Sequence, residues 1–444
     1  MRSTFSGSLL LLFVLVTAQT LYAKSTPETL ARQATSADAS ESTSAIAELR
    51  ELGPAGLETL RQVYADEINR QVANPLLAAT PEWQRLSLAL DTVSQQKDSY
   101  LSGLYWYTDF GQAKAAARAA GKPILSLRLL GKLNEEFSCA NSRFFRTILY
   151  SNEEIARTLR EKFILHWQSV RPAPRVTIDF GDGRKLERTL TGNSIHYILD
   201  SNGQVIDALP GLYGPGAFLR SLAKMEEVSK YWGQRPSEGD LRQPYWAYQP
   251  DSLRRITLNW ALDTERIGGK APQGFVIRRN PDGTPTALEI ASLAITKSVT
   301  EASILRAMTA GPEALGAMTD EAAWNKIAQL HIADAQLDER SIELIQRQTQ
   351  KALFTNASKV GQSKTLTALI EKLQRNIALD TVRNEYLLHT KLYVWLVADH
   401  QRSDLNELNK KVYFELFLTP ATDPWLGLFS PETYVALESA GIVR

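Results

Sequence analysis

The chain contains a single cysteine, Cys139, among 444 residues. One thiol cannot form an intramolecular disulfide, and it cannot build a zinc or iron–sulfur site that needs several cysteines. The fold must therefore rest on apolar burial, and hydrophobic residues make up 44% of the chain, which is enough for real cores. Because the length exceeds that of one usual domain, we expect two or three folding units.

The N-terminus has the pattern of a secretory signal peptide over residues 1–23. Arg2 gives a short positive start, an apolar run follows over 9–16, and Ala23 offers a small residue at the cleavage point. The apolar run is too short to span a bilayer, and no later segment is apolar for long enough. We therefore expect an exported protein, periplasmic or secreted, without stable membrane insertion after cleavage.

Charge is nearly balanced, with 50 Lys and Arg against 49 Asp and Glu. A nucleic-acid surface requires a basic surplus or a basic stripe, so the composition argues against nucleic acid as a partner. The chain has no Walker, dinucleotide-binding or serine-hydrolase motif. We therefore expect no cofactor.

Helical periodicity marks an N-terminal helical region over 24–100 and a C-terminal helical domain over 288–444. In the first, Gly53 and Pro54 separate the two helices of a predicted hairpin. The segment 229–287 carries prolines and glycines and is expected to be a linker with short strands. Four stretches of the C-terminal domain have helical spacing: 324–331, 339–351, 366–377 and 385–398.

Residues 101–228 alternate between helix and strand signals, which predicts an α+β fold. Asp109 can cap an alanine-rich helix that ends at Gly121, and Ser151 with Glu154 forms a capping box for a later helix. Apolar runs and turn signals predict strands over 122–129, 163–167, 176–178, 186–190, 195–199 and 204–208.

This order of helix, strand, cysteine-bearing helix, strands and final helix resembles the thioredoxin-like superfamily. The segment Lys122-Pro123-Ile124-Leu125 is similar to the first central strand of that family, and 198–205 is similar to its final hairpin. The resemblance covers 101–228. It implies a thioredoxin-like central domain flanked by the N-terminal and C-terminal helical regions.

The motif at the family's C-x-x-C position is a single-cysteine variant, C-x-x-S. Cys139 occupies the attacking position and Ser142 replaces the resolving cysteine. The proline that normally precedes the final hairpin is missing at 193–195, and a hairpin over 176–190 stands where the family usually has a helix. These departures argue against dithiol oxidase or reductase activity. The resemblance implies thiol/disulfide exchange or thiol capture through Cys139, with a protein or a thiol/disulfide substrate as partner.

Residue types around Cys139 allow two interpretations. A helix N-terminus stabilises a thiolate, Ser142 can donate a hydrogen bond to it, and Arg143 and Arg146 follow at helical spacing on the same face. In the alternative, Cys139 is an inert side chain packed among nearby phenylalanines, and both arginines pair with glutamates. The protein would then be a non-catalytic scaffold that binds a protein partner through its helical regions.

Histidines give a third and weaker hypothesis, metal-dependent chemistry. His166 and His196 lie in predicted strands. A histidine in such a place more often has its own hydrogen-bond partner than a shared metal. His331 and Asp334 have an i, i+3 spacing that can ligate a metal, but two ligands do not make a site. We therefore assign no metal ligands.

Overall fold

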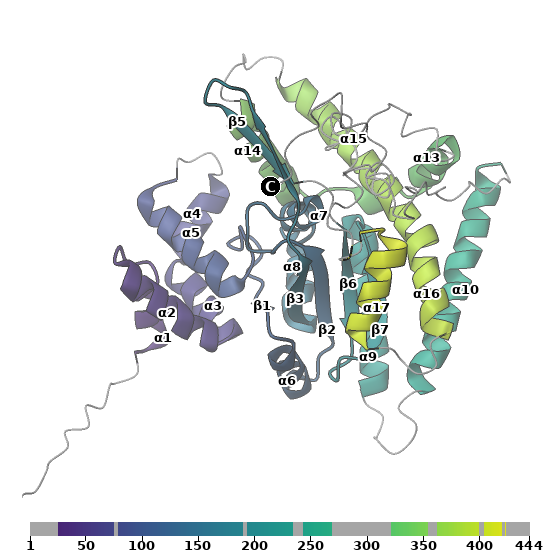
Figure 1. Ribbon diagram of the computed structural model, residues 1–444, viewed down its shortest axis with the longest axis horizontal. Coiled ribbons are helices and arrows are strands. Elements are labelled where there is room, and N and C mark those ends of the chain that lie inside the picture. Colours follow the sequence, from purple (N-terminus) through teal and green to yellow (C-terminus); the bar gives the residue numbers. More distant parts are fainter. Residues whose placement is uncertain are drawn as a thin grey trace, which may run out of the picture.

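The computed structural model describes residues 25–74, 79–189, 193–233, 243–268, 321–353, 362–398, 404–419 and 422. In these parts the fold is α+β, and a mixed sheet stands between two groups of helices (Figure 1). The expected signal peptide over 1–23 lies outside the described residues. Within them, no helix combines the length and the apolar character that crossing a membrane requires.

The central sheet has the strand order β1-β3-β2-β6-β7. Its strands are β1 (Trp106–Tyr107), β2 (Ile124–Leu130), β3 (Ile164–Arg171), β6 (Ser194–Leu199) and β7 (Val205–Pro210). Strand β3 runs parallel to β1 and β2, whereas β6 is antiparallel to β2 and to β7. Every residue of β2 and β6 is buried, because helices cover both faces of these central strands.

Helices of the central unit begin close to the predicted residues, although α9 continues past 228, the expected end of this unit. They are α6 (Phe110–Ala120), α7 (Ala140–Phe144), the π-helix η1 (Phe145–Leu149), α8 (Glu153–Lys162) and α9 (Pro215–Gly233). The Asp109 carboxylate accepts the N–H of Gln112, and Gly121 ends α6 with a φ of 63°, as predicted. The predicted cap of α8 is wrong by one residue, because Asn152 caps the helix while the Ser151 hydroxyl donates to the preceding turn.

The predicted hairpin over 176–190 is confirmed as a separate two-stranded sheet. Strand β4 (Arg175–Asp179) pairs antiparallel with β5 (Lys185–Thr189). Carboxylates stabilise the turn between them, since Asp179 accepts the N–H of Gly181 and Asp182 accepts the N–H of Arg184. The hairpin projects away from the central sheet (Figure 1).

The N-terminal helices enclose a small core of their own. They are α1 (Pro27–Gln33), α2 (Ala39–Glu51), α3 (Pro54–Val63), α4 (Ala65–Ala73) and α5 (Pro81–Ser94). Arg50 ties them to the sheet, since its guanidinium donates to the carbonyl of Val93 in α5 and to that of Trp106 in β1. The Tyr105 hydroxyl also donates a hydrogen bond to the backbone carbonyl of Arg50, at 2.9 Å.

C-terminal helices pack against the β7 side of the sheet and share its core. They are α10 (Gln243–Arg266), α13 (Glu321–Leu330), the 3₁₀ helix η3 (Ile332–Ala335), α14 (Glu339–Leu353), α15 (Gln362–Arg383), the π-helix η4 (Asn384–His389), α16 (Thr390–Ala398), α17 (Leu405–Lys411) and the π-helix η5 (Val412–Leu416). The expected linker over 229–287 lies partly outside the described residues. Where it is described, α9 extends into it and α10 forms despite Pro250, because tertiary packing buries Ser252 and Ile256.

The turn between β7 and α9 brings the sheet into close contact with these C-terminal helices. A Cβ on Gly211 would lie 2.6 Å from the amide nitrogen of Asn384, and a Cβ on Gly214 would lie 2.2 Å from the carbonyl oxygen of Asp334. The Gly214 N–H also donates to the hydroxyl of Thr381 at 2.8 Å. At Gly214, only glycine allows the two backbones to approach this closely.

Replacing Gly214 by alanine tests this close approach. We expect Gly214→Ala to lower the free energy of unfolding by about 1–3 kcal/mol, the usual cost of overpacking, because the Asp334 backbone must move. Gly111→Ala is the control, since the nearest atom there is a side-chain oxygen of Asp109 at 3.1 Å, and alanine favours the helix. Urea unfolding measures both variants, and equal effects would contradict the docking role of the turn.

Candidate functional site

Cys139 stands where β2 leads into α7. It is the N-cap residue of α7, its side chain is 0% exposed, and its N–H donates to the carbonyl of Leu130 at 3.3 Å. The Ser142 hydroxyl donates to the backbone carbonyl of Cys139 at 2.9 Å. The structure thus brings the predicted residues together, with the Ser142 hydroxyl directed at the backbone of the motif.

The two predicted arginines differ in their surroundings. Arg146 is buried, and its guanidinium donates to the carbonyl of Glu135 at 3.2 Å and to the hydroxyl of Ser138 at 3.4 Å. Arg143, by contrast, is half-buried. Burial lowers the pKa of Arg146, against the opposing charges of nearby carboxylates. The contacts of Arg146 fix the loop that precedes Cys139.

The C-terminal helices cover the strand end that faces this motif. The Tyr413 hydroxyl donates to the carbonyl of Asn193 at 2.8 Å, and the Asn193 amide donates to the carbonyl of Phe417 at 3.2 Å. On the motif side, the Asn141 amide donates to the hydroxyl of Ser194 at 2.9 Å. Residues 193 and 194, where the thioredoxin-like pattern has its proline, therefore bridge α7 and η5.

The strand histidines occupy separate positions. His166 in β3 bonds to the hydroxyl of Ser126 at 2.8 Å, and His196 in β6 bonds to the hydroxyl of Tyr150 at 2.7 Å. Burial lowers the pKa of each imidazole to about 3. Both are neutral core histidines, each with its own hydroxyl partner.

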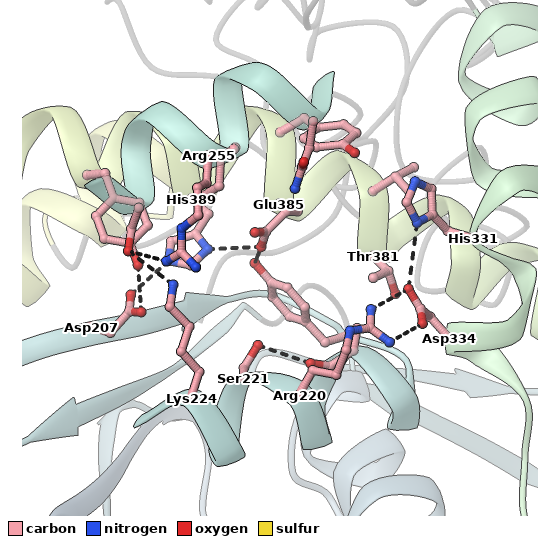
Figure 2. Close-up of a pocket in the computed structure, with 18 of the residues that line it drawn as sticks. Asp207, Arg220, Ser221, Lys224, Arg255, His331, Asp334, Thr381, Glu385 and His389 are labelled. Atoms are coloured by element: carbon pink, nitrogen blue, oxygen red, sulfur yellow. Dashed lines mark hydrogen bonds and ion pairs between the residues drawn. The ribbon is translucent and has the colours of Figure 1, made fainter. Parts of the chain in front are cut away.

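A cavity of about 250 Å³ lies between α9 of the central unit and the C-terminal helices. We call it the α9–α10 cavity. Figure 2 shows its lining side chains arriving from both layers. Among those that line it are Asp207, Ser221, Lys224, Arg255, Asn259 and Glu385.

A buried carboxylate–imidazole–carboxylate network forms one wall of the cavity. His389 in η4 contacts the Asp207 carboxylate of β7 at 2.8 Å and the Glu385 carboxylate at 2.9 Å. Asp207 also accepts the hydroxyls of Tyr248 at 2.5 Å and Tyr393 at 2.6 Å. The Asp207 and His389 side chains are each only 5% exposed.

Protonation of this network follows from its charges. Burial alone would lower the pKa of His389, but the two carboxylates outweigh it and raise that pKa to about 9. Burial likewise opposes ionisation of Asp207, yet the charge of His389 and the hydrogen bonds hold the pKa of Asp207 below its ordinary value. At neutral pH the wall therefore contains an imidazolium between two carboxylates.

A second histidine cluster lies at the other end of the cavity. His331 contacts Asp263 at 2.5 Å and Asp334 at 3.7 Å. The carboxylates of Asp334 and Asp263 together raise the pKa of His331, although burial opposes this. Arg220 pairs with Asp334 through both terminal nitrogens. In the described part of the chain, no group of three or more His, Cys, Asp or Glu residues is arranged to hold a metal.

Sequence reasoning singled out His331 with Asp334, but it missed the Asp207 network. Asp207 lies within an ordinary strand pattern, and its histidine partner follows 182 residues later. The local signal was the i, i+4 spacing of Glu385 and His389 on a predicted helix, which places both side chains on one face.

Comparisons with protein-family models, with curated proteins and with solved structures give no match to this chain.

The His389 network makes stability depend on pH. The pKa of His389 is about 9 in the folded chain against an ordinary value of 6.5, so its contribution is complete below about pH 6.5 and is lost as pH rises through about 9. The contribution is about 3 kcal/mol, at 1.36 kcal/mol per pKa unit.

Urea unfolding of the wild type and of His389→Gln measures this contribution. Between about pH 6 and about pH 9.5, we expect the free energy of unfolding to fall further in the wild type than in the variant. His331 titrates in both proteins and cancels in the comparison. Equal losses would contradict an imidazolium at position 389.

Proposed function

We propose that the protein binds a small polar molecule in the α9–α10 cavity. The observation that carries this proposal is the buried network of Asp207, His389 and Glu385 on the cavity wall. Buried ion pairs are costly to desolvate, and well-packed apolar residues often stabilise a fold equally well. Perturbed titratable groups that line a cavity are therefore candidates for function.

Local geometry supports the same proposal. Glu385 and His389 lie on the π-helix η4, and such widened turns are frequent at functional sites. The cavity lies between two layers that come from different parts of the sequence, a common place for small-molecule sites. Its volume of about 250 Å³ suits a small metabolite.

A tryptophan in the cavity tests the proposal. Ser221 lines the cavity from α9, so Ser221→Trp should fill it and abolish binding of small polar compounds that ligand-observed NMR detects with the wild type. Ala223→Trp, on the exposed side of the same helix, is the control and should retain binding. Binding that survives Ser221→Trp would place the ligand elsewhere, and a polar-compound library without any wild-type binder would reject the proposal.

A second candidate function is the thiol/disulfide exchange or thiol capture that the sequence predicts for an exported thioredoxin-like protein. Its support is the strand order β1-β3-β2-β6-β7 and the position of Cys139 at the start of the helix that follows β2. Because Cys139 is 0% exposed, this function requires the side chains packed around the thiol to move. The scaffold alternative, with a protein partner on the helical regions, requires no such motion.

Alkylation of native Cys139 tests the thiol function. If that function holds, iodoacetamide reacts with the native protein, and Tyr413→Ala accelerates the reaction because it removes the contact with Asn193. Phe414→Ala changes an exposed neighbour, 59% accessible, and should leave the rate unchanged. A native thiol that resists alkylation at every pH, while the unfolded chain reacts, would reject the thiol function and leave the cavity proposal standing.

A further inference from the structure

Two cationic side chains converge on a single hydroxyl at the α9–α10 cavity. The Lys224 ammonium of α9 donates to the Ser252 hydroxyl oxygen at 3.0 Å, and the Arg255 guanidinium of α10 donates to the same oxygen at 3.0 Å. Ser252 is 1% exposed. Figure 2 shows Lys224 and Arg255 reaching toward one another from the two layers. Like charges in such proximity repel each other.

Lys224 lacks a carboxylate within ion-pair distance among the described residues. Besides Ser252, its ammonium lies over the Tyr248 ring, 4.7 Å from the centroid. Burial lowers the pKa of Lys224. The charge of Arg255 lowers this pKa further, whereas the charge of Asp207 raises it. Arg255 has a counter-charge in Asp251, whose carboxylate lies 3.5 Å from its Nε.

The carboxylates of the cavity already have donors. Asp207 accepts from His389 and two tyrosines, as described above, and Glu385 accepts from His389 and from Tyr213 at 3.2 Å. Asp334 is held by Arg220. The carboxylates on the cavity walls are therefore already hydrogen-bonded. Lys224 and Arg255, by contrast, both donate to the uncharged hydroxyl of Ser252.

We propose that the α9–α10 cavity takes a small oxyanion, a carboxylate or a phosphate, which lies between Lys224 and Arg255. This inference rests on the proposed function and names its ligand class. An oxyanion offers several acceptor oxygens where Ser252 offers one, and hydrogen bonds between charged partners are stronger than those to a neutral hydroxyl. The cavity volume of about 250 Å³ limits the ligand to a small acid or phosphate ester.

Titration calorimetry with inorganic phosphate, with succinate and with its neutral analogue succinamide tests the inference. We expect phosphate or succinate to bind the wild type, and Lys224→Met and Arg255→Gln to weaken that binding at least about tenfold. Arg254→Gln is the control and should bind as the wild type does, because Arg254 adjoins Arg255 on the same helix but does not line the cavity. Whichever anion binds better assigns the carboxylate or the phosphate.

Thermal unfolding separates loss of binding from loss of fold. Without phosphate, Lys224→Met should not lower the midpoint temperature of unfolding, because it removes one of two charges that repel each other. Millimolar phosphate should raise the midpoint temperature of the wild type alone. Anions that bind both variants as tightly as the wild type would overturn the inference, as would failure of both anions to bind. Succinamide binding that Ser221→Trp abolishes and Lys224→Met does not would reject the anion while leaving the cavity function intact.

Discussion

The ion pair between Asp207 and His389 holds the C-terminal helices against the sheet. Asp207 lies on the edge strand β7, and its carboxylate accepts hydrogen bonds from its own strand, from Tyr248 of α10, from His389 of η4 and from Tyr393 of α16. A buried carboxylate that loses its partners is strongly destabilising. The chain must therefore bring three helical segments to this edge together, and the cavity between the two layers forms as a result.

Close backbone packing reinforces that arrangement next to the cavity. The widened turn η4, which carries His389, is fixed at Asn384, whose amide donates to the carbonyl of Leu212 at 2.7 Å. Gly211 and Gly214 remove the side chains that would hold η4 and η3 away from this turn. The position of His389 thus depends on polar contacts at Asp207 and on steric fit at the glycine turn.

Local signals predicted most of the central unit and little of the cavity. The Asp109 cap and the apolar run of β2 act over a few residues, so the sequence displays them directly. Asp207 has no such signal, because its partners are distant in sequence and only the fold reveals them. The α10 helix was missed for a related reason: Pro250 argued locally for a linker, whereas burial of Ser252 and Ile256 against other layers stabilises a helix.

The two candidate sites depend on different C-terminal helices, and helix packing covers one site while it builds the other. At the thiol motif, Tyr413 and Phe417 bond to Asn193, so the η5 segment covers the strand end that faces this motif. At the cavity, α10 and η4 supply Arg255 and His389, so helix packing completes the site. An anion held by Lys224 of α9 and Arg255 of α10 would join the two layers, and ligand that binds only the packed state stabilises that state.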